Sequence, residues 1–245
     1  MVHLVIDAMG GDNGSPIVVK AIKDFLKDYP NVKLTVVGKK EELEELTTLC
    51  RIIDAREVVK MEAGALEVLR ARDSSMMVAL KTLKEEGLDG IVSCGSTGGF
   101  LSASTIILKM IPGVKRASLV TAFPTKIKDK KVVILDVGAS NENSGEELAQ
   151  FALMGRLFYE ARYKKDEEIK TYLLSNGVEE EKGSPSGKEA FKILKEKHFP
   201  GFQGNIEGRD VVSGKADVVV TDGYSGNIFL KGTEGATKMI GGMIS

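Results

Sequence analysis

The chain has 245 residues, a formal net charge of −1 at pH 7 and 42% hydrophobic residues. This length allows one large α/β domain or two small ones, and the balanced charge lacks the basic footprint of a nucleic-acid-binding protein. With two cysteines and two histidines, the sequence predicts neither a disulfide framework nor a metal site. No apolar run approaches the roughly 18 residues that span a bilayer, and residues 1–10 read as a strand and turn rather than a signal peptide. We therefore expect a soluble cytoplasmic protein.

The first part of the chain alternates short apolar runs with amphipathic segments. Ser15 is a good N-cap with Pro16 at the first helical position, so a helix is expected over 16–29. Asp73 or Ser74 is expected to cap a later helix. The pattern predicts strands at 3–7, 32–38 and 51–55, and further helices at 39–50 and 61–72.

The same alternation continues in the second part. Ser144 with Glu147, and Ser186 with Glu189, have the spacing of capping boxes that open helices. Residues 128–131 read as a solvated hairpin tip, and 199–208 as an extended Gly-rich segment. Strands are predicted at 117–124, 132–137, 169–175 and 216–221, and helices at 144–161, 186–197 and from about 226 onward. Alternation of this kind predicts a mostly parallel sheet covered on both faces, in a single α/β domain over 1–245.

The stretch 88–108 organises the chain. A short strand around Ile91 and Val92 leads into a loop of glycines and hydroxyl groups, and a helix follows. Glycines let the backbone approach a ligand, and free amides at a helix start favour an anion. Similar loops follow four other predicted strands. In one parallel sheet these five loops would share the carboxyl edge, where we expect a binding site for phosphate. The loops lie at 7–12, 93–98, 136–141, 176–177 and 222–227.

The residue types in these loops limit the reactions that the chain could catalyse. There is no G-x-S-x-G elbow, no Walker lysine and no dinucleotide fingerprint, so a serine hydrolase, a P-loop enzyme and a Rossmann dehydrogenase are excluded. Cys94 is either a thiolate nucleophile or a small residue in a tight loop. His198 reads as a helix-end histidine. The remaining polar set, with Lys182 and Arg209 as nearby cations, suits a phosphate or an acyl phosphate.

Eight motifs in order along almost the whole chain resemble the phosphate acyltransferases of bacterial phospholipid synthesis, the PlsX-type acyl-carrier-protein:phosphate transacylases. The matching stretches are DAMGGD at 7–12, RDSSM at 72–76, SCGSTGG at 93–99, LDVGA at 135–139, QFALMG at 150–155, EKG at 181–183, GNIEGRD at 204–210 and ADVVVTDGYSGN at 216–227.

The resemblance implies a three-layer α/β/α sandwich like that of the isopropylmalate dehydrogenase and phosphotransacetylase folds. It implies transfer of a long-chain fatty acyl group from acyl carrier protein to inorganic phosphate, without cofactor or metal. Carried over by position, Lys182 and Asn227 are the expected catalytic residues. The expected substrate and phosphate contacts are Asp7, Gly10, Gly11, Ser96, Thr97, Gly98, Asp136, Gly138, Arg209, Asp222 and Gly223.

The chain departs from the family pattern at several points. Ser96 stands where the family usually has Asn, Ser175-Asn176-Gly177 replaces Asn-Ile-Gly, and Ser140-Asn141-Glu142 replaces Asn-x-Asp. Family members also continue past the position of Ser245, so the C-terminal part of the family domain is expected to be missing here. The resemblance implies a homodimer, and the family's peripheral membrane contact is expected to be weak in this chain.

Two other functions stay open at the level of the sequence. One is a phosphotransacetylase-like enzyme that transfers short acyl groups with coenzyme A. The other is a non-catalytic module that keeps the fold and binds a carrier protein. The first would differ in the width of its acyl site, and the second would turn over no acyl thioester.

Overall fold

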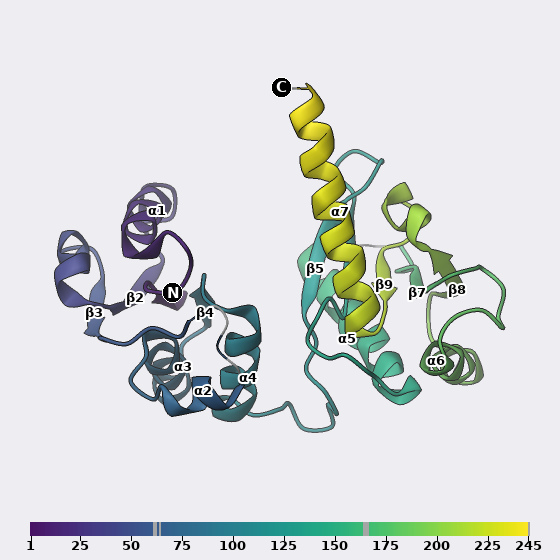
Figure 1. The fold of residues 1–245 in the computed structure, drawn as a ribbon, viewed down its shortest axis with the longest axis horizontal. Coiled ribbons are helices and arrows are strands. Elements are labelled where there is room, and N and C mark those ends of the chain that lie inside the picture. The colour runs from purple at the N-terminus through teal and green to yellow at the C-terminus, as the bar shows by residue number, and fades with distance from the viewer. Residues whose placement is uncertain (61–62, 64, 164–166, 245) are drawn as a thin grey trace. The chain divides into compact units, whose positions relative to one another are not determined.

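The computed structural model describes residues 1–60, 63, 65–163 and 167–244 and contains two compact units, residues 1–111 and residues 112–245 (Figure 1). Each unit has its own sheet, covered by helices. The alternation of strands and helices predicts one sheet for all the strands, whereas the structure divides them between two. Strand order depends on contacts between distant segments, which local periodicity does not encode. The single α/β domain over 1–245 stays a prediction.

Unit 1 has a four-stranded sheet in the order β3-β2-β1-β4, with every neighbouring pair parallel. The strands are β1 (His3–Asp7), β2 (Lys33–Gly38), β3 (Arg51–Asp54) and β4 (Gly90–Ser93). The helices are α1 (Gly14–Asp28), the 3₁₀ helix η1 (Lys40–Leu46), α2 (Ala65–Arg70), α3 (Ser75–Glu86) and α4 (Thr97–Ile107).

Side chains that alternate along the strands build two layers of core in unit 1. Ile6 of β1 packs with Val18 of α1 and Leu43 of η1 on one face of the sheet. Val5, on the other face, packs with Ala79 of α3. Helices α2 and α4 pack with α3, so they lie on that second face as well. Unit 1 is thus a helix–sheet–helix sandwich.

Unit 2 has a five-stranded sheet in the order β5-β6-β9-β7-β8. Only the hairpin β5–β6 is antiparallel, and the other pairs are parallel. The strands are β5 (Val120–Pro124), β6 (Lys131–Leu135), β7 (Thr171–Ser175), β8 (Phe202–Glu207) and β9 (Val218–Val220). The helices are α5 (Gly145–Tyr163), α6 (Pro185–Glu196), η2 (Gly208–Ser213) and α7 (Gly223–Ile244).

The β-branched strands β6 and β9 form the centre of unit 2. Val133 and Val218 face the helices α5 and α6, where Phe151 is fully buried. Ile134 and Val219 face the opposite side, where they are covered by η2 and by Phe229 of α7. Unit 2 is therefore also a three-layer α/β/α sandwich, with a mostly parallel sheet. This confirms the fold class expected from the sequence.

Several helix starts differ from the sequence prediction. Ser15 is buried inside α1 and does not cap it, because α1 begins at Gly14, two residues before the predicted start at residue 16. The predicted helix 39–50 is the shorter 3₁₀ helix η1. Of the predicted helix 61–72, α2 covers 65–70, and residues 61, 62 and 64 lie outside the described residues. Segment 202–207, expected only to be extended, is strand β8.

The two expected capping boxes have different outcomes. The Ser144 hydroxyl accepts from the amide of Glu147, and the Glu147 carboxylate accepts from the amide of Ser144, which confirms the first box. The second is wrong, because Ser184 caps α6 by accepting from the amide of Gly187. The carboxylate of Glu189 instead accepts from the amide of Gly145, at 3.0 Å, and so joins α6 to the start of α5.

A buried carboxylate, Asp217, anchors the start of β9. It is fully buried, it lies 3.0 Å from the ammonium group of Lys130, and it accepts from the backbone amide of Lys170 at 2.8 Å. Tyr159 of α5 also hydrogen-bonds it. Burial, and then the negative charge of Asp217 and this hydrogen bond, raise the pKa of Tyr159 to about 12.

We expect Tyr159→Phe to flatten the alkaline part of the stability profile. Since the folded-state pKa of Tyr159 is raised above the ordinary value near 10, its contribution is fully present below about pH 10 and is lost as pH rises toward about 12. Urea unfolding from pH 8 to 12 measures this. The parent should lose more unfolding free energy above pH 10 than the variant, and parallel profiles would contradict the assignment.

Candidate functional site

In unit 1, the loops after β1 and β4 touch at the carboxyl edge of the sheet. Asp7 is buried. Its carboxylate accepts hydrogen bonds from the Ser93 hydroxyl at 2.7 Å and from the amide of Met9 at 3.3 Å. A Cβ on Gly10 would lie 2.6 Å from the Cα of Gly95, so only glycine allows this approach. The carboxylate of Asp7 therefore holds the two loops together.

The start of α4 lies in the second of these loops. Ser96 is buried and caps the helix by accepting from the amide of Gly99 at 3.2 Å. Thr97 and Gly98 follow it in the first helical turn and are exposed. Within the described parts of the chain, their backbone amides have no acceptor. This is the amide arrangement that favours an anion at a helix N-terminus.

In unit 2, the carboxylate of Asp136 organises the loop after β6. The residue is fully buried. Its Oδ1 accepts from the amides of Leu119, Gly138 and Ala139 at 3.1, 3.1 and 2.8 Å. Its Oδ2 accepts from the amide and hydroxyl of Ser140 at 3.1 and 2.9 Å. Because all five donors belong to the protein, the carboxylate shapes the loop and is closed to a ligand.

The start of α7 packs directly on that loop. A Cβ on Gly223 would lie 2.0 Å from the carbonyl oxygen of Ser140, so the helix needs glycine at this position. The side-chain oxygen of Asn143 accepts from the Ser140 hydroxyl and from the amide of Gly223. Asp222 caps α7, accepting from the amide and hydroxyl of Ser225 at 2.8 and 2.9 Å.

Two adjoining polar pockets, of about 520 and 500 Å³, open at this edge of unit 2. Ser184 at the start of α6 and Asp222 and Ser225 at the start of α7 line both of them. In the described chain, the amides of Ser186 and Tyr224, in the first turns of these helices, have no acceptor. Two helix N-termini thus meet at one hollow rich in hydroxyl and amide groups, which suits an anion.

Neither of the two expected catalytic residues, Lys182 and Asn227, is among those that line the two pockets. Lys182 is exposed in the loop between β7 and α6, where its alkyl stem lies over Gly177. None of the ion pairs found among the described residues involves Lys182. Asn227, one turn into α7, is exposed, and its side chain lies 3.4 Å from where a Cβ on Gly138 would be. Their catalytic roles stay predictions.

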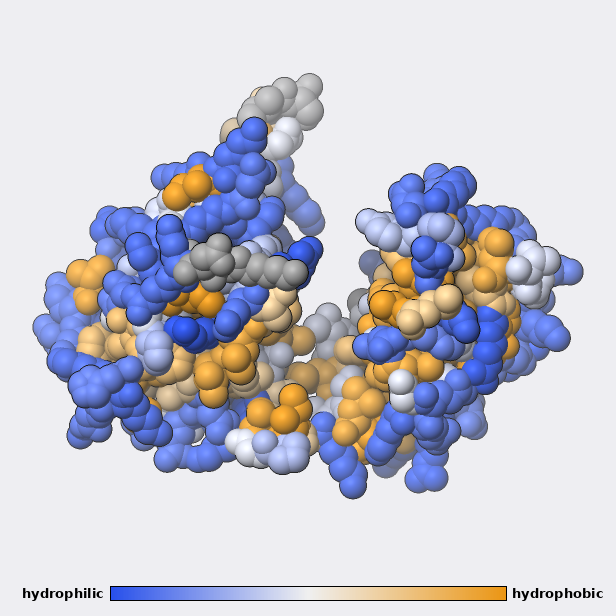
Figure 2. All heavy atoms as spheres, turned by 180° about the vertical axis from the view of Figure 1, so that it is seen from behind, coloured by the Kyte–Doolittle hydropathy of each residue, from blue (hydrophilic) through white to orange (hydrophobic). Residues whose placement is uncertain are grey.

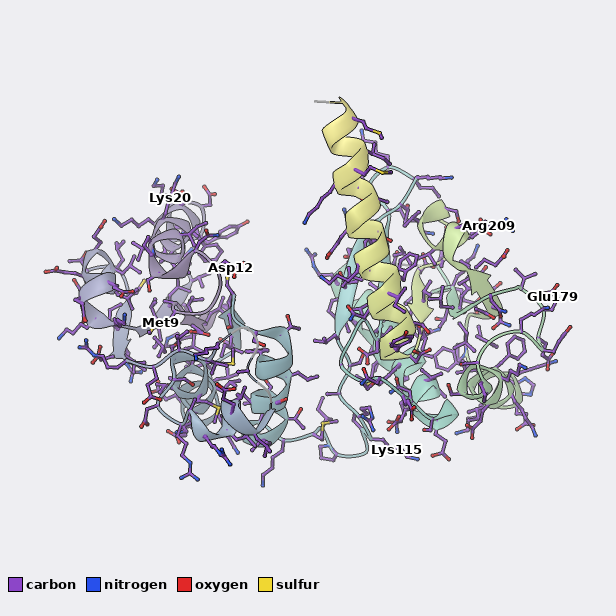
Figure 3. The ribbon with its side chains drawn as sticks, viewed as in Figure 1. Met9, Asp12, Lys20, Lys115, Glu179 and Arg209 are labelled. Atoms are coloured by element: carbon purple, nitrogen blue, oxygen red, sulfur yellow. The ribbon has the colours of Figure 1, made fainter. Side chains whose placement is uncertain are left out.

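Arg209 stands apart from the pockets. It follows Gly208, which lines one of them, but its guanidinium pairs with Glu207 at 2.7 Å. Figure 3 shows it extending outward from η2. A contact between Arg209 and phosphate would require this side chain to turn, and it stays a prediction.

The structure groups the predicted site residues by unit. Asp7, Gly10, Gly11, Ser96, Thr97 and Gly98 belong to unit 1, and Asp136, Gly138, Lys182, Arg209, Asp222, Gly223 and Asn227 belong to unit 2. The sequence analysis did not single out Asn143, which joins the β6 loop to α7, or Ser184 as the cap of α6. Both are hydroxyl or amide side chains just before a helix start, so a search for caps could have found them.

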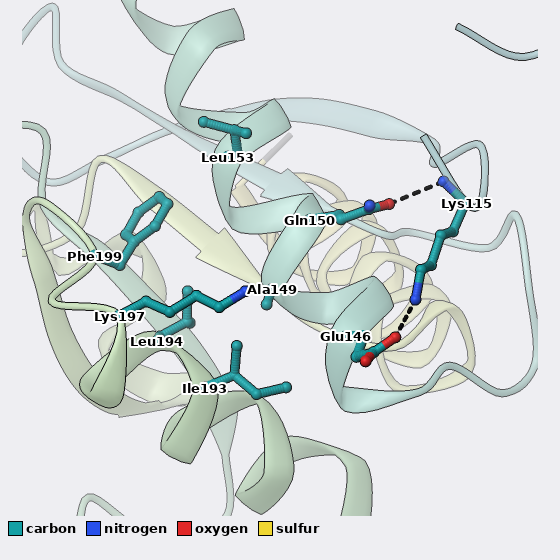
Figure 4. Close-up of a pocket in the computed structure, with 9 residues that line it drawn as sticks. All are labelled: Lys115, Glu146, Ala149, Gln150, Leu153, Ile193, Leu194, Lys197 and Phe199. Carbon is teal, nitrogen blue, oxygen red and sulfur yellow. Dashed lines mark hydrogen bonds and ion pairs between the residues drawn. The ribbon is translucent and has the colours of Figure 1, made fainter. Parts of the chain in front are cut away.

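A further groove lies between α5 and α6, and none of the predicted site residues lines it (Figure 4). Its volume is about 480 Å³, and Leu153 and Phe199 are among its apolar walls. At one end, the amide of Lys115 donates to the side chain of Gln150 at 2.9 Å, and its ammonium group pairs with Glu146. The groove carries no cluster of groups suited to acyl transfer.

The fold is shared with phosphotransacetylases of known structure. A phosphotransacetylase from Streptococcus pyogenes superposes with a TM-score of 0.68 at 21% identity, over 94% of this chain and 80% of that one. A second, from Staphylococcus aureus, gives a TM-score of 0.65 at 18% identity, over 98% of this chain and 82% of that one. At these sequence identities, the structural similarity establishes a shared fold only.

Sequence comparison shows the family. Residues 2–245 match the family described as fatty acid synthesis protein. The phosphate acyltransferase of Aliarcobacter butzleri is 37% identical over 100% of this chain and 74% of its own length. That of Staphylococcus aureus strain JH9 has the same identity and the same coverage. The chain belongs to this family of PlsX-type phosphate acyltransferases, enzymes that transfer an acyl group to phosphate.

We expect Asp136→Asn to lower the unfolding free energy by about 3 kcal/mol, because the amide that replaces one oxygen faces donors and the charge-assisted hydrogen bonds are lost. Urea denaturation measures this. Glu142→Gln, an exposed change in the same loop, is the matched control and should leave stability unchanged. Equal stability of the two variants would show that Asp136 does not hold the loop.

Proposed function

We propose that the chain transfers a long-chain fatty acyl group from the thioester of acyl carrier protein to inorganic phosphate, giving acyl phosphate for phospholipid synthesis. The observation that carries the proposal is the polar hollow in unit 2, where the first turns of α6 and α7 meet. Membership of the family supports phosphate as the acceptor. The carrier-protein donor and the long chain rest on the family resemblance of the motifs.

Phosphate is proposed to bind to backbone amides more than to charged side chains. The open amides of Ser186 and Tyr224 are the donors at the hollow in unit 2, and those of Thr97 and Gly98 are the donors at the start of α4 in unit 1. Helix dipoles add favourable potential at all three starts. Asp136 and Asp7 act through the loops they hold, since their carboxylates are buried and satisfied within the protein.

The reaction needs no covalent enzyme intermediate, because a phosphate oxygen is a competent nucleophile. It attacks the thioester carbonyl carbon, and the tetrahedral intermediate collapses with release of the pantetheine thiolate, which takes up a proton. Lys182 is proposed to offset the phosphate charge, and the Asn227 amide to donate to the developing oxyanion. Holding the reactants together and stabilising that oxyanion are the two contributions that the protein supplies.

The experiment that tests this function is incubation with palmitoyl-acyl carrier protein and labelled phosphate, with detection of acyl phosphate by mass. The proposal expects palmitoyl phosphate to form. Formation only from acetyl-coenzyme A would identify a short-chain phosphotransacetylase. Absence of turnover with every acyl thioester, together with retained binding of the carrier protein, would identify a non-catalytic module.

We expect Lys182→Ala to reduce kcat/KM by roughly 10²- to 10³-fold, the usual effect of removing one group that stabilises developing charge. Because the residue is exposed, stability should not change. Lys188→Ala removes another exposed lysine nearby, on the second turn of α6, and serves as the matched control. Equal kinetics of the two variants would remove Lys182 from the catalytic set.

The chain is further proposed to act as a cytoplasmic homodimer that associates through α7. This helix extends well beyond the rest of unit 2 (Figure 1) and exposes Ile228, Met239, Ile240 and Met243. Exposed apolar surface of this size marks an interface. None of the described helices is both long and apolar enough to cross a bilayer, and contact with a membrane is proposed to be weak and peripheral.

We expect Ile240→Asp to convert the dimer into a monomer, because it places a charge in the apolar face of α7. Sedimentation velocity at micromolar concentration measures the change, with Lys238→Asp on the same turn as control. A parent that sediments as a monomer would contradict the dimer. Liposome flotation of the parent tests the membrane contact, and strong flotation would contradict the proposed weak association.

A further inference from the structure

The loop between β7 and α6, residues 176–184, carries Lys182 and has no apolar core of its own. Its one apolar residue besides the glycines, Val178, is 59% exposed. Most of the visible surface of unit 2 is hydrophilic in Figure 2, and Figure 3 places Glu179 on the outer side of the loop. Because burial of apolar side chains does not fix this segment, its conformation depends on hydrogen bonds.

A buried amide side chain holds the middle of this loop. Asn205 of β8 is only 7% exposed, and its Nδ2 donates to the carbonyl oxygen of Glu179 at 2.7 Å. The same carbonyl oxygen accepts from the backbone amide of Lys182 at 3.1 Å. One carbonyl group therefore joins a side chain of the sheet to the backbone of the lysine.

A second amide side chain fixes the residue that follows Lys182. The Oδ1 of Asn176, directly after β7, accepts from the amide of Gly183 at 2.9 Å. Gly183 has a φ of 103°, a left-handed conformation that glycine adopts without strain. The alkyl stem of Lys182 lies against Gly177, where a Cβ would be 2.8 Å from the lysine Cγ. The backbone on both sides of Lys182 and the start of its side chain are thus held in place.

Asn205 serves the loop and does not contact a ligand in the hollow of unit 2. It lines neither of the two polar pockets there, whereas Gly183 and Ser184, which directly follow Lys182, line the larger one. Burial of an amide side chain is costly unless it is hydrogen-bonded, and the bond to the loop meets that requirement. The position of Lys182 beside the pocket therefore depends on a residue of a neighbouring strand.

We propose that Asn205 is a positioning residue for Lys182 and acts through the carbonyl group of Glu179, while Asn176 holds the other side. The inference rests on the proposed function and on the role of Lys182 in it, and it adds the residues that direct this lysine toward phosphate. A lysine whose backbone and first methylene groups are already ordered loses less conformational freedom when its ammonium group binds an anion.

A double-mutant cycle tests the positioning. Asn205→Leu keeps a similar size and removes the donor, and we expect it to lower kcat/KM for phosphate roughly tenfold, because the lysine is present but no longer held. In the Lys182→Ala background the same substitution should cost less than about twofold, since the group that it positions is gone. Gln203→Leu removes an exposed amide from the same strand, so it is the matched control and should leave kcat/KM unchanged.

Two measurements detect the positioning without turnover. Titration with inorganic phosphate, followed by phosphorus NMR, gives the Kd for the parent, the two single variants and the double variant, and the effects on Kd should again be non-additive. Amide hydrogen exchange reports on the loop itself. The amide of Lys182 should exchange roughly fivefold faster in Asn205→Leu, as expected for loss of one hydrogen bond, whereas that of Val219 in the centre of the sheet should not change.

A second pair of variants tests the loop from an exposed position, where folding of the core is not affected. Asn176→Ala removes the acceptor, and the amide of Gly183 should exchange faster. Asn176→Asp keeps an acceptor oxygen at the same place, so it should restore the protection of Gly183.

The outcomes separate this inference from the proposed function. Losses that multiply in the double variant, or unchanged exchange at Lys182 and Gly183, would overturn the positioning role while the function stands. A non-additive cycle in phosphate affinity, without acyl phosphate from any thioester, would support the positioning and refute the function. Equal phosphate affinity in all of these variants would remove Lys182 from phosphate binding and overturn the inference.

Discussion

The buried carboxylate of Asp136 is the constraint on which the site in unit 2 depends. Five donors converge on its two oxygens, four of them from the loop that directly follows its own strand. Burying an ion is costly unless its acceptor sites are filled, so the chain after β6 is held in one conformation. The start of α7 then packs on that loop through Gly223, and Asn143 bonds to both. The position of Asp222 follows from these contacts.

In unit 1 a buried aspartate likewise organises the site, but it accepts fewer hydrogen bonds. Asp7 ends the first strand, as Asp136 follows β6, and it is also buried, but besides one amide of its own loop it binds a side chain at the end of the neighbouring strand. The two aspartates therefore fix different things: one shapes a single loop, and the other ties two loops together. Glycines, hydroxyl groups and helix amides are part of the candidate site in both units, and in unit 2 the carboxylates of Asp222 and Glu142 also line the pockets.

The sequence predicts local features well and non-local ones poorly. Strand β1 has the predicted bounds because clear turn residues follow its apolar run. Ser144 and Glu147 form the expected box because both partners lie within one turn. The division into two sheets was missed, since strand order depends on pairings between residues far apart in the chain. Ser186 was predicted as a cap because Glu189 follows it at the spacing of a capping box, but Glu189 instead reaches the start of another helix, and Ser184 caps α6. The gathering of Ser184, Asp222 and Ser225 likewise depends on packing between segments.

The hydrogen bond between Glu189 and the amide of Gly145 has a mechanical consequence. It ties the first turns of α6 to the first residue of α5, so α6 cannot move away from α5 without breaking this bond. The loop that carries Lys182 runs from β7 to α6, and it is held at one end by the sheet and at the other by this contact with α5. The ends of this loop therefore have little freedom to separate. The entropy lost in closing the loop is lost when the protein folds, and not when the substrate binds. The side chain of Lys182 can then reorient toward an anion while the backbone of its loop stays in place.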